Sequence, residues 1–283
     1  MPMIRSNYHS HTNFCDGTDS PEKYVEKALE LGLKAYGFSS HAPTPYPVVK
    51  WCMKMDRRWD YINEIKRLKD IYKDRIDLYC SMEIDFIPRK MGCSAPWIKE
   101  LGLDYTVGSI HFVSFEEEGI PWEIDGTHEV FMRGLRSVFG GDIKKAVTHY
   151  FDLTREMIDH DCPDILGHMD KIKMHNTDFR YFDEAEPWYR KQIMETLSLA
   201  KSKQLLVEVN TRGIYKKKTT ETYPSIGILK EMKKMEIPVV VNSDSHHPEE
   251  ITNCFDVAYS LLKAAGYKET FHFLNGKWIA EEI

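Results

Sequence analysis

The chain has 283 residues, of which 42% are hydrophobic and 29% charged, and its formal net charge is −6 from 38 basic and 44 acidic side chains. These values are typical of a soluble globular enzyme, and the length allows one α/β barrel or two smaller domains. The acidic balance argues against a nucleic-acid partner, because the surface of a general nucleic-acid binder is basic. We find no secretion signal and no apolar segment of membrane-spanning length, so we expect a cytoplasmic protein without a membrane partner.

Short apolar runs alternate with amphipathic segments along the chain. The runs that predict strands span residues 4–8, 35–39, 78–82, 105–110, 164–166, 205–209 and 239–241. The segments that predict helices span residues 20–32, 60–72, 95–101, 144–158, 187–201, 226–235 and 254–265. Strands that alternate with helices imply parallel pairing through right-handed crossovers. Because no repeat or Pro/Gly/Ser linker divides the sequence, we expect one α/β domain over residues 1–283.

The connection over residues 112–142 is the exception to this alternation. It carries an acidic run at residues 116–118, aromatic patches and the pair Gly140-Gly141. A connection of this length typically forms a lid or a binding loop. A surface excursion without contact to the site is an equally open alternative.

Side chains of the metal-binding type follow nearly every predicted strand. His9 and His11 stand two residues apart directly after the first strand, and Asp244 and His246 do so after the last. Because residues i and i+2 of a strand point to the same face, the members of each pair project together. The other ends carry His41, Glu83, His111 and His168, and Asp16 lies in the loop after the first strand. Active sites of (β/α) barrels lie at the carboxyl ends of the strands, so we expect these residues to converge.

Such a group of imidazoles and carboxylates predicts a metal cluster. A single ion cannot use so many ligands once water keeps open positions, so two or three divalent ions are implied. Glu83 is the candidate bridge between ions, because it is the central carboxylate on an inner strand. Nitrogen and oxygen ligands suit zinc, manganese or iron. The six cysteines are scattered without a Cys-x-x-Cys pair, so neither a disulfide framework nor a thiolate site is expected.

The order of these motifs resembles the polymerase-and-histidinol-phosphatase (PHP) superfamily. The order is His-x-His, a nearby acid, Ser-His, Met-Glu, Gly-Ser-Ile-His, Gly-His and Asp-Ser-His, from His9 to His246. Residues 39–43 (SSHAP), 108–112 (GSIHF) and 210–213 (NTRG) look like the histidinol-phosphate phosphatase branch. The resemblance implies a distorted (β/α)7 TIM-like barrel with a long insertion after the fourth strand and a trinuclear metal centre.

The resemblance also implies a ligand set for each ion and a reaction. The first ion would take His9, His11, Glu83 and Asp244, the second Glu83, His111 and His168, and the third Asp16, His41 and His246. The implied reaction is hydrolysis of a small-molecule phosphate ester, L-histidinol phosphate, in histidine biosynthesis, by a hydroxide that bridges two ions. Glu83, Asp244 and His246 would be catalytic, with Asp244 and His246 nearest to protonate the leaving alkoxide.

Several further side chains have open roles. Arg212 is the first candidate for binding the phosphate, because a planar guanidinium suits phosphate oxygens, although a solvated ion pair is as plausible. Weaker cationic candidates are Arg180, Lys173 and Arg155, and residues 216–218 are expected to form a solvated basic face. Asp85 would orient a ligating His or form an unrelated ion pair. Trp51, Trp122 and Tyr215 would stack on an imidazole or simply pack.

Other functions stay open at this point. A related phosphoesterase would act on other phosphomonoesters or nucleotides. An amidohydrolase also uses His-x-His and a late Asp, but no Lys has an obvious place as its bridging ligand. A non-catalytic binding module would have lost ligands, whereas this chain keeps every candidate position. The sequence carries no P-loop or dinucleotide fingerprint, and it does not indicate the oligomeric state.

Overall fold

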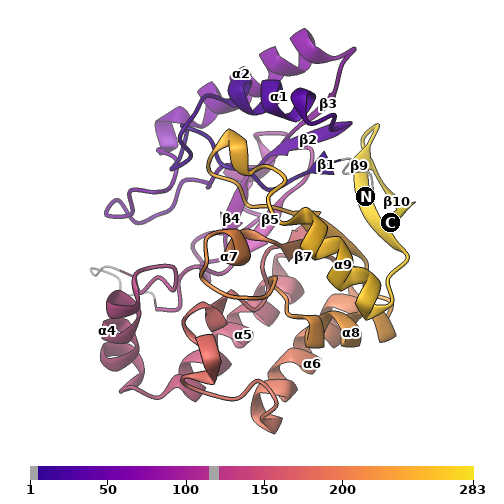
Figure 1. The fold of residues 1–283 in the computed structure, drawn as a ribbon. Coiled ribbons are helices and arrows are strands. Elements are labelled where there is room, and N and C mark those ends of the chain that lie inside the picture. Colours follow the sequence, from indigo (N-terminus) through magenta and orange to yellow (C-terminus); the bar gives the residue numbers. More distant parts are fainter. Residues whose placement is uncertain (1–5, 115–120) are drawn as a thin grey trace.

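The computed structural model describes residues 6–114 and 121–283 (Figure 1). The parallel strands are β1 (Ser6–Asn7), β2 (Ala35–Phe38), β3 (Asp77–Cys80), β4 (Glu83–Asp85), β5 (Val107–Ser109), β6 (Ile165–Leu166), β7 (Leu206–Asn210) and β8 (Val239–Asn242). The helices are α1 (Pro21–Glu30), α2 (Arg58–Tyr72), α3 (Pro96–Lys99), α4 (His128–Phe139), α5 (Ile143–His160), α6 (Pro187–Ser202), α7 (Arg212–Tyr215), α8 (Ile226–Lys234) and α9 (Phe255–Ala265). The short 3₁₀ helices are Met55–Arg57, Lys171–His175, Thr177–Phe179 and Pro248–Glu250. Every predicted strand and helix is present, with ends that differ by a few residues.

The parallel strands form a staggered and incompletely paired ring. One sheet has the order β1–β2–β3, and the other has the order β4–β5–β6–β7–β8. Parallel bridges between His41 and Glu83 and between Ser10 and Ser245 join the two sheets. Because β3 runs almost directly into β4, these two strands occupy one position of the ring, and β1 follows β8. The predicted α/β fold with parallel strands is confirmed, and the arrangement is consistent with the expected distorted (β/α)7 barrel.

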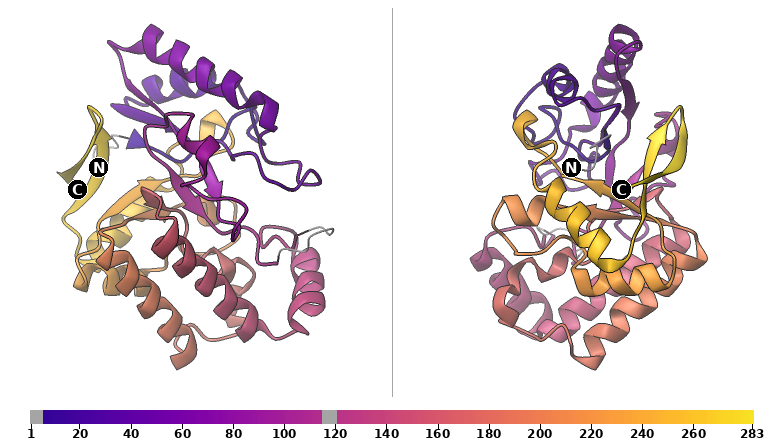
Figure 2. Two further views of the ribbon diagram at one scale, coloured as in Figure 1. Left: turned by 180° about the vertical axis from the view of Figure 1, so that it is seen from behind. Right: turned by 45° about the vertical axis from the view of Figure 1, so that its right-hand side comes forward.

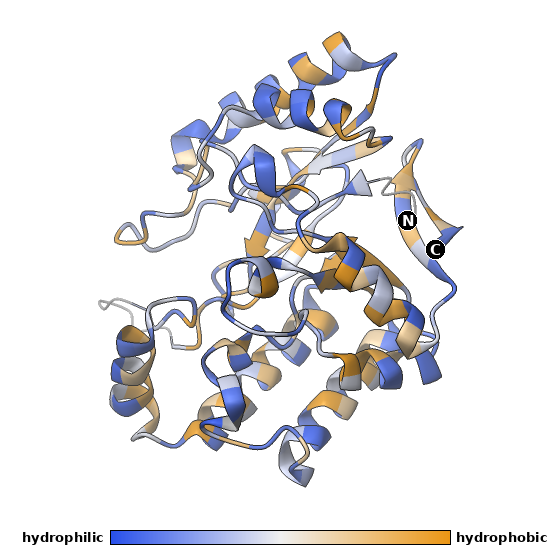
Figure 3. Cartoon of the chain, in the orientation of Figure 1, coloured by the Kyte–Doolittle hydropathy of each residue, from blue (hydrophilic) through white to orange (hydrophobic). Residues whose placement is uncertain are grey.

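Helices cover the outside of the ring in two groups, each over its own hydrophobic core (Figures 1 and 2). α1 and α2 pack against the β1–β3 sheet, where Tyr24 and Ile65 are fully buried. α5, α6, α8 and α9 cover the larger sheet, where Phe151 and Leu229 are fully buried. β7 and β8 are largely hydrophobic, while the helices show mixed polarity, as amphipathic helices over a buried parallel sheet do (Figure 3). No helix in the described part of the chain combines the length and apolarity that a membrane crossing requires.

The long connection between β5 and α5 contains a helix that the sequence pattern did not predict. Thr127 accepts a hydrogen bond from the Val130 amide and starts α4, and Gly140, with φ of 61°, ends it in the left-handed conformation that glycine favours. Trp122 and Phe131 from this connection belong to the larger core. Much of the segment is therefore a packed part of the domain. The acidic run at residues 116–118 lies outside the described residues, and a lid function over residues 112–142 stays a prediction.

A C-terminal hairpin, β9 (Glu269–Leu274) and β10 (Lys277–Glu282), was missed by the sequence analysis. It packs against aromatic side chains inside the amino-terminal end of the ring, where the Tyr8 hydroxyl donates to the Phe273 carbonyl at 3.0 Å (Figure 2). Asn275 and Gly276 both have positive φ, the turn conformation that an Asn-Gly pair supplies between two strands. The hairpin therefore covers the end of the ring opposite to the strand ends that carry the predicted ligands.

Candidate metal centre

The predicted ligands converge at the carboxyl ends of the parallel strands. The structure brings together His9, His11, Asp16, His41, Glu83, His111, His168, Asp244 and His246. Most of these side chains are buried, whereas Asp16 lies exposed at the rim and His246 is partly exposed. Asp244 adopts a positive φ of 52° directly after β8, a conformation that Asp tolerates better than most residues. This turn places Asp244 and His246 beside the ligands that follow β1.

Glu83, at the start of β4, lies at the centre of the group. Its Oε2 atom faces ring nitrogens of His9, His11 and His41, at 3.2, 3.4 and 2.9 Å. Its Oε1 atom lies 2.9 Å from His168 Nε2 and 3.6 Å from His111 Nε2. The two oxygens of one buried carboxylate therefore face two different sets of imidazoles, which is the geometry that a bridging ligand requires.

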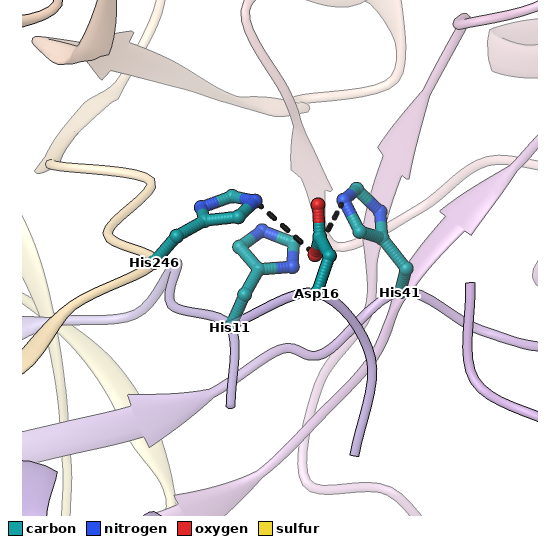
Figure 4. Close-up of side chains that lie close together, drawn as sticks. All are labelled: His11, Asp16, His41 and His246. Carbon is teal, nitrogen blue, oxygen red and sulfur yellow. Dashed lines mark ion pairs between the residues drawn. The ribbon is translucent and has the colours of Figure 1, made fainter. Parts of the chain in front are cut away.

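The outer part of the group gathers around Asp16 (Figure 4). Asp16 Oδ1 lies 3.3 Å from His246 Nε2 and 3.8 Å from His41 Nε2. The His11 ring stacks on the His246 ring with centroids 4.1 Å apart. Asp244 Oδ1 connects this part to the centre, because it lies 3.2 Å from His11 Nε2.

Unpartnered atoms in the centre fit a metal site. His9 Nε2, His11 Nε2, His41 Nδ1 and Glu83 Oε2 are buried and make no hydrogen bond within the described residues. A buried polar atom without a partner is costly, so these atoms are arranged to bind something other than protein. Ligand-type atoms gather in the sets His9–His11–Asp244, His9–Glu83–His168, His41–Glu83–His111 and His11–Asp16–His41–His246. His41 thus lies between Glu83 and Asp16, whereas the expected grouping placed it with Asp16 and His246 alone.

The electrostatics keep the carboxylates ionised. Burial alone would raise the pKa of Glu83, but His9, His111 and His41 outweigh it and hold the pKa well below its usual range. His9 and Arg212 have the same effect on the pKa of Asp244. Burial, together with the neighbouring imidazoles, lowers the pKa of His11, so its ring is neutral at pH 7. The carboxylates in turn raise the pKa of His9 and bring that of His111 to about 9, so these two rings would release a proton when an ion binds.

Several ring nitrogens that point away from the centre are held by hydrogen bonds. His111 Nδ1 lies 3.0 Å from Asp85 Oδ1, which also accepts from the His111 amide, and this favours the orienting role considered for Asp85. His9 Nδ1 lies 2.7 Å from Glu208 Oε1. The sequence analysis missed Glu208, although a charged residue inside the apolar strand Leu206–Asn210 was a signal of an inward-pointing polar group.

A pocket of about 380 Å³ opens beside the outer ligands and is lined by cationic side chains. The cationic residues are Lys171, Arg212, Lys216 and Lys218, and the lining also contains the carboxylates of Asp16, Glu123, Asp125 and Asp244. Arg212 donates to the Asp244 carbonyl at 2.7 Å, so the predicted phosphate-binding candidate lies in the site. Lys216 and Lys218 are exposed, as the predicted solvated face over residues 216–218 requires, and they also line the pocket. The weaker candidates, Arg155, Arg180 and Lys173, are not among the residues that line it.

Lys171 was also missed by the sequence analysis. Its side chain is 8% exposed, and its ammonium lies 2.7 Å from Asp125 Oδ2 and 3.3 Å from His111 Nε2. Burial alone would lower the pKa of Lys171, but Asp125, Asp244 and Glu83 outweigh it and raise the pKa. Lys171 therefore carries a positive charge against the inner ligands.

The aromatic candidates separate into a pocket residue and packing residues. Trp51 lines the pocket, packs edge-on against the His41 ring and donates from its indole nitrogen to Glu123 at 2.7 Å. Trp122 is 5% exposed and packs on Phe131 in the core. Tyr215 is tied to the Ser243 carbonyl at 2.9 Å.

Comparison with known proteins gives matches over nearly the whole chain. The PHP domain model matches residues 7–212. A protein of Deinococcus radiodurans named "Probable histidinol-phosphatase" is 28% identical over 263 residues, covering 91% of this chain and 92% of that protein. The crystal structure of hisK from Listeria monocytogenes has a TM-score of 0.77 at 24% identity, over 89% of this chain and 99% of that one. Histidinol phosphate phosphatase of Lactococcus lactis, solved with zinc, L-histidinol and phosphate, has a TM-score of 0.70 at 22% identity, over 97% and 98%.

Proposed function

This chain belongs to the PHP domain family, and on that premise we propose that it is a metal-dependent phosphomonoesterase that hydrolyses L-histidinol phosphate to L-histidinol and phosphate. The observation that carries the proposal is Glu83, whose two oxygens face two sets of imidazoles beside a cation-lined pocket. The relatives support the substrate, because histidinol-phosphatase is the name of the similar proteins and the Lactococcus protein was solved with L-histidinol and phosphate.

We assign the predicted ligands to two or three divalent ions. His9, His11 and Asp244 would hold one ion together with Glu83 Oε2, and His111 and His168 would hold a second with Glu83 Oε1. Asp16, His41 and His246 would hold the third. Nitrogen and oxygen donors suit zinc, manganese or iron, and zinc in the Lactococcus relative supports the first of these. When bound, such ions lower the pKa of coordinated water and neutralise charge on phosphoryl oxygens.

The cations of the pocket bind the phosphate group in this proposal. A phosphomonoester carries nearly two negative charges, and Lys171 and Arg212 supply positive charge from two sides of the pocket. Burial alone would lower the pKa of Arg212, but Asp244 and Tyr215 outweigh it and raise the pKa, so the guanidinium stays charged. Its hydrogen bond to the Asp244 carbonyl fixes the guanidinium beside the ligands.

The predicted catalytic residues divide into cation holders and a proton carrier. Glu83 and Asp244 have pKa values far below neutrality, so they act as carboxylates and do not supply a proton at pH 7. The leaving alkoxide needs a proton, and His246, with its side chain 13% exposed at the rim of the pocket, is the remaining candidate to carry it. Burial and Arg212 lower its pKa, so it would first have to take up a proton from solvent, and it could not hold the third ion in that step.

A substrate panel tests the proposal. Initial rates of the purified protein are measured on L-histidinol phosphate, on mononucleotides and on single-stranded DNA, and the metal content of the same sample is determined by elemental analysis. We expect bound metal and a kcat/KM on L-histidinol phosphate at least tenfold above that on any mononucleotide. Equal or higher kcat/KM on nucleotides would point to the related phosphoesterase, and a protein without bound metal or phosphatase activity would contradict the proposal.

A further inference from the structure

Glu208 lies in the middle of β7, fully buried behind the metal centre, and its two oxygens accept four hydrogen bonds. Oε1 lies 2.7 Å from His9 Nδ1 and accepts from Asn242 Nδ2 at 3.0 Å. Oε2 accepts from the His168 backbone amide at 2.9 Å and from Asn210 Nδ2 at 3.0 Å. One side chain therefore contacts two of the predicted ligands.

The side-chain amides of Asn210 and Asn242, which contact Glu208, each have one fixed orientation. Asn242 Oδ1 accepts from the Tyr8 amide at 2.8 Å, and Asn210 Oδ1 accepts from the Arg212 amide at 2.9 Å. Because a backbone amide can only donate, these two contacts orient both side-chain amides with their NH₂ groups toward Glu208. Three of the four contacts of Glu208 are therefore fixed donors, which favours the ionised form of its carboxyl group. Glu208 is therefore a carboxylate that accepts from every side, and His9 donates to it from Nδ1.

The contact with Glu208 determines which ring nitrogen of His9 faces the metal centre. With its proton on Nδ1, the His9 ring presents the Nε2 lone pair, which lies 3.2 Å from Glu83 Oε2. His168, held at its backbone by the same Glu208, places Nε2 at 2.9 Å from Glu83 Oε1. Glu208 thus fixes one imidazole on each side of the candidate bridge.

We propose that Glu208 is a positioning residue that holds His9 and His168 ready for cations on both sides of Glu83. The inference rests on the metal centre of the proposed function. Within the described residues, His9 is the only basic side chain at ion-pair distance from Glu208, so cations at the centre also offset the charge of this buried carboxylate. Carboxylates that accept from ligating imidazoles fix the ring orientation, and their loss typically weakens metal binding by ~10–100-fold.

The experiment compares Glu208→Gln and Glu208→Asp with the wild type. Gln has the same side-chain shape as Glu, but its NH₂ group replaces one oxygen and would face a neighbouring hydrogen-bond donor. Asp keeps the negative charge, but its side chain is one methylene shorter. Zinc affinity is measured by competition with a chromophoric chelator, and the melting temperature of each metal-free protein is measured in parallel. Asp161→Asn is the matched control, because Asp161 is also a buried carboxylate, accepts a hydrogen bond from the Ser94 amide at 2.6 Å, and is neither a candidate ligand nor a pocket residue.

We expect Glu208→Gln to bind zinc about 10–100-fold more weakly, Glu208→Asp to be intermediate, and Asp161→Asn to keep the wild-type zinc affinity. If Glu208→Gln does not fold, Glu208→Asp alone gives the comparison. Wild-type zinc affinity in every folded variant at position 208, whatever the change in melting temperature, would overturn the role of Glu208. A wild-type protein that binds no zinc, manganese or iron would instead refute the proposed function from which the inference starts.

Discussion

The inner and outer parts of the candidate metal centre use the same side-chain types in different surroundings. The inner part, around Glu83, is almost fully buried, and carboxylates of Glu208 and Asp85 hold its imidazoles from behind. In the outer part, the Asp16 side chain is 34% exposed. There His246 Nδ1 lies 3.1 Å from the main-chain carbonyl of Asp244. Charge-assisted hydrogen bonds orient a ligand more strongly than neutral ones do. We therefore expect tight binding inside and weaker, exchangeable binding outside.

The largest effect is expected from a change at the centre of the inner part. Glu83→Gln removes the charge shared by both sets of imidazoles, so both inner ions should be lost and kcat/KM on L-histidinol phosphate should fall by about 10³-fold or more. Elemental analysis and steady-state kinetics measure this result. Glu64→Gln, at a partly exposed position outside the site, serves as the control for a carboxylate-to-amide change. Full metal content in Glu83→Gln would show that the inner set does not depend on a shared carboxylate.

A change in the outer part should be milder and selective. Asp16→Asn removes the exposed carboxylate between His41 and His246, and we expect the loss of one ion, with the inner ions retained, and a fall in activity of about 10–100-fold. Metal stoichiometry after dialysis against a weak chelator distinguishes the two sets. Loss of all ions together would abolish the distinction between inner and outer parts.

The pocket cation beside the inner part should act on substrate binding and leave the metal content unchanged. Lys171→Met removes a positive charge that lies 3.3 Å from His111 Nε2, and we expect KM for L-histidinol phosphate to rise by about tenfold or more. Kinetics and elemental analysis on the same sample check both halves of this expectation. An unchanged KM would place the phosphate elsewhere, and a lost ion would make Lys171 part of the support of the inner site.

The smallest effect concerns the ion pair between Asp125 and Lys171. Burial would raise the pKa of Asp125, but Lys171 and His111 outweigh it and lower the pKa to about 2, against ~3.9 in an unfolded chain. A depressed pKa contributes stability that is complete above the unfolded value and is lost as the pH falls through the folded value. Because the Asp125 side chain is 37% exposed, we expect Asp125→Asn to lower the melting temperature by only about 1–4 °C at pH 7.

The pH dependence of the melting temperature tests whether the effect of Asp125→Asn comes from the ion pair. Melting temperatures of wild type and Asp125→Asn are compared from pH 7 downward by circular dichroism. The gap should be constant above about pH 5 and should close between about pH 4 and pH 2. A gap that widens as the pH falls would contradict the ion pair.

The ligands of both parts could be predicted from sequence because their signal is local. A His or acid directly after an apolar run, repeated at most strands, places those side chains at one end of a parallel barrel, whatever the details of packing. The spacing of two residues between His9 and His11 also predicts that both side chains point to the same face. The alternation of strands and helices likewise predicted the parallel pairing of the α/β fold.

The residues that support the ligands could not be found in this way. The carboxylate that contacts His9 is determined by how β7 pairs with β8 and how β8 lies against β1, and no local sequence pattern contains that register. Lys171 belongs to the 3₁₀ helix Lys171–His175, beside the buried ion pair between Asp170 and Lys173. These contacts between side chains are not visible in a local sequence pattern. The missed hairpin is different, because its Asn275-Gly276 turn was visible in the sequence.

The most direct test of the account is a crystal structure of the zinc-loaded protein with anomalous scattering recorded at the zinc edge. We expect strong peaks on both sides of Glu83, one among His9, His11 and Asp244 and one between His111 and His168, and a weaker peak near Asp16. The absence of a peak within bonding distance of either Glu83 oxygen would contradict the central claim that this carboxylate joins the two inner sites.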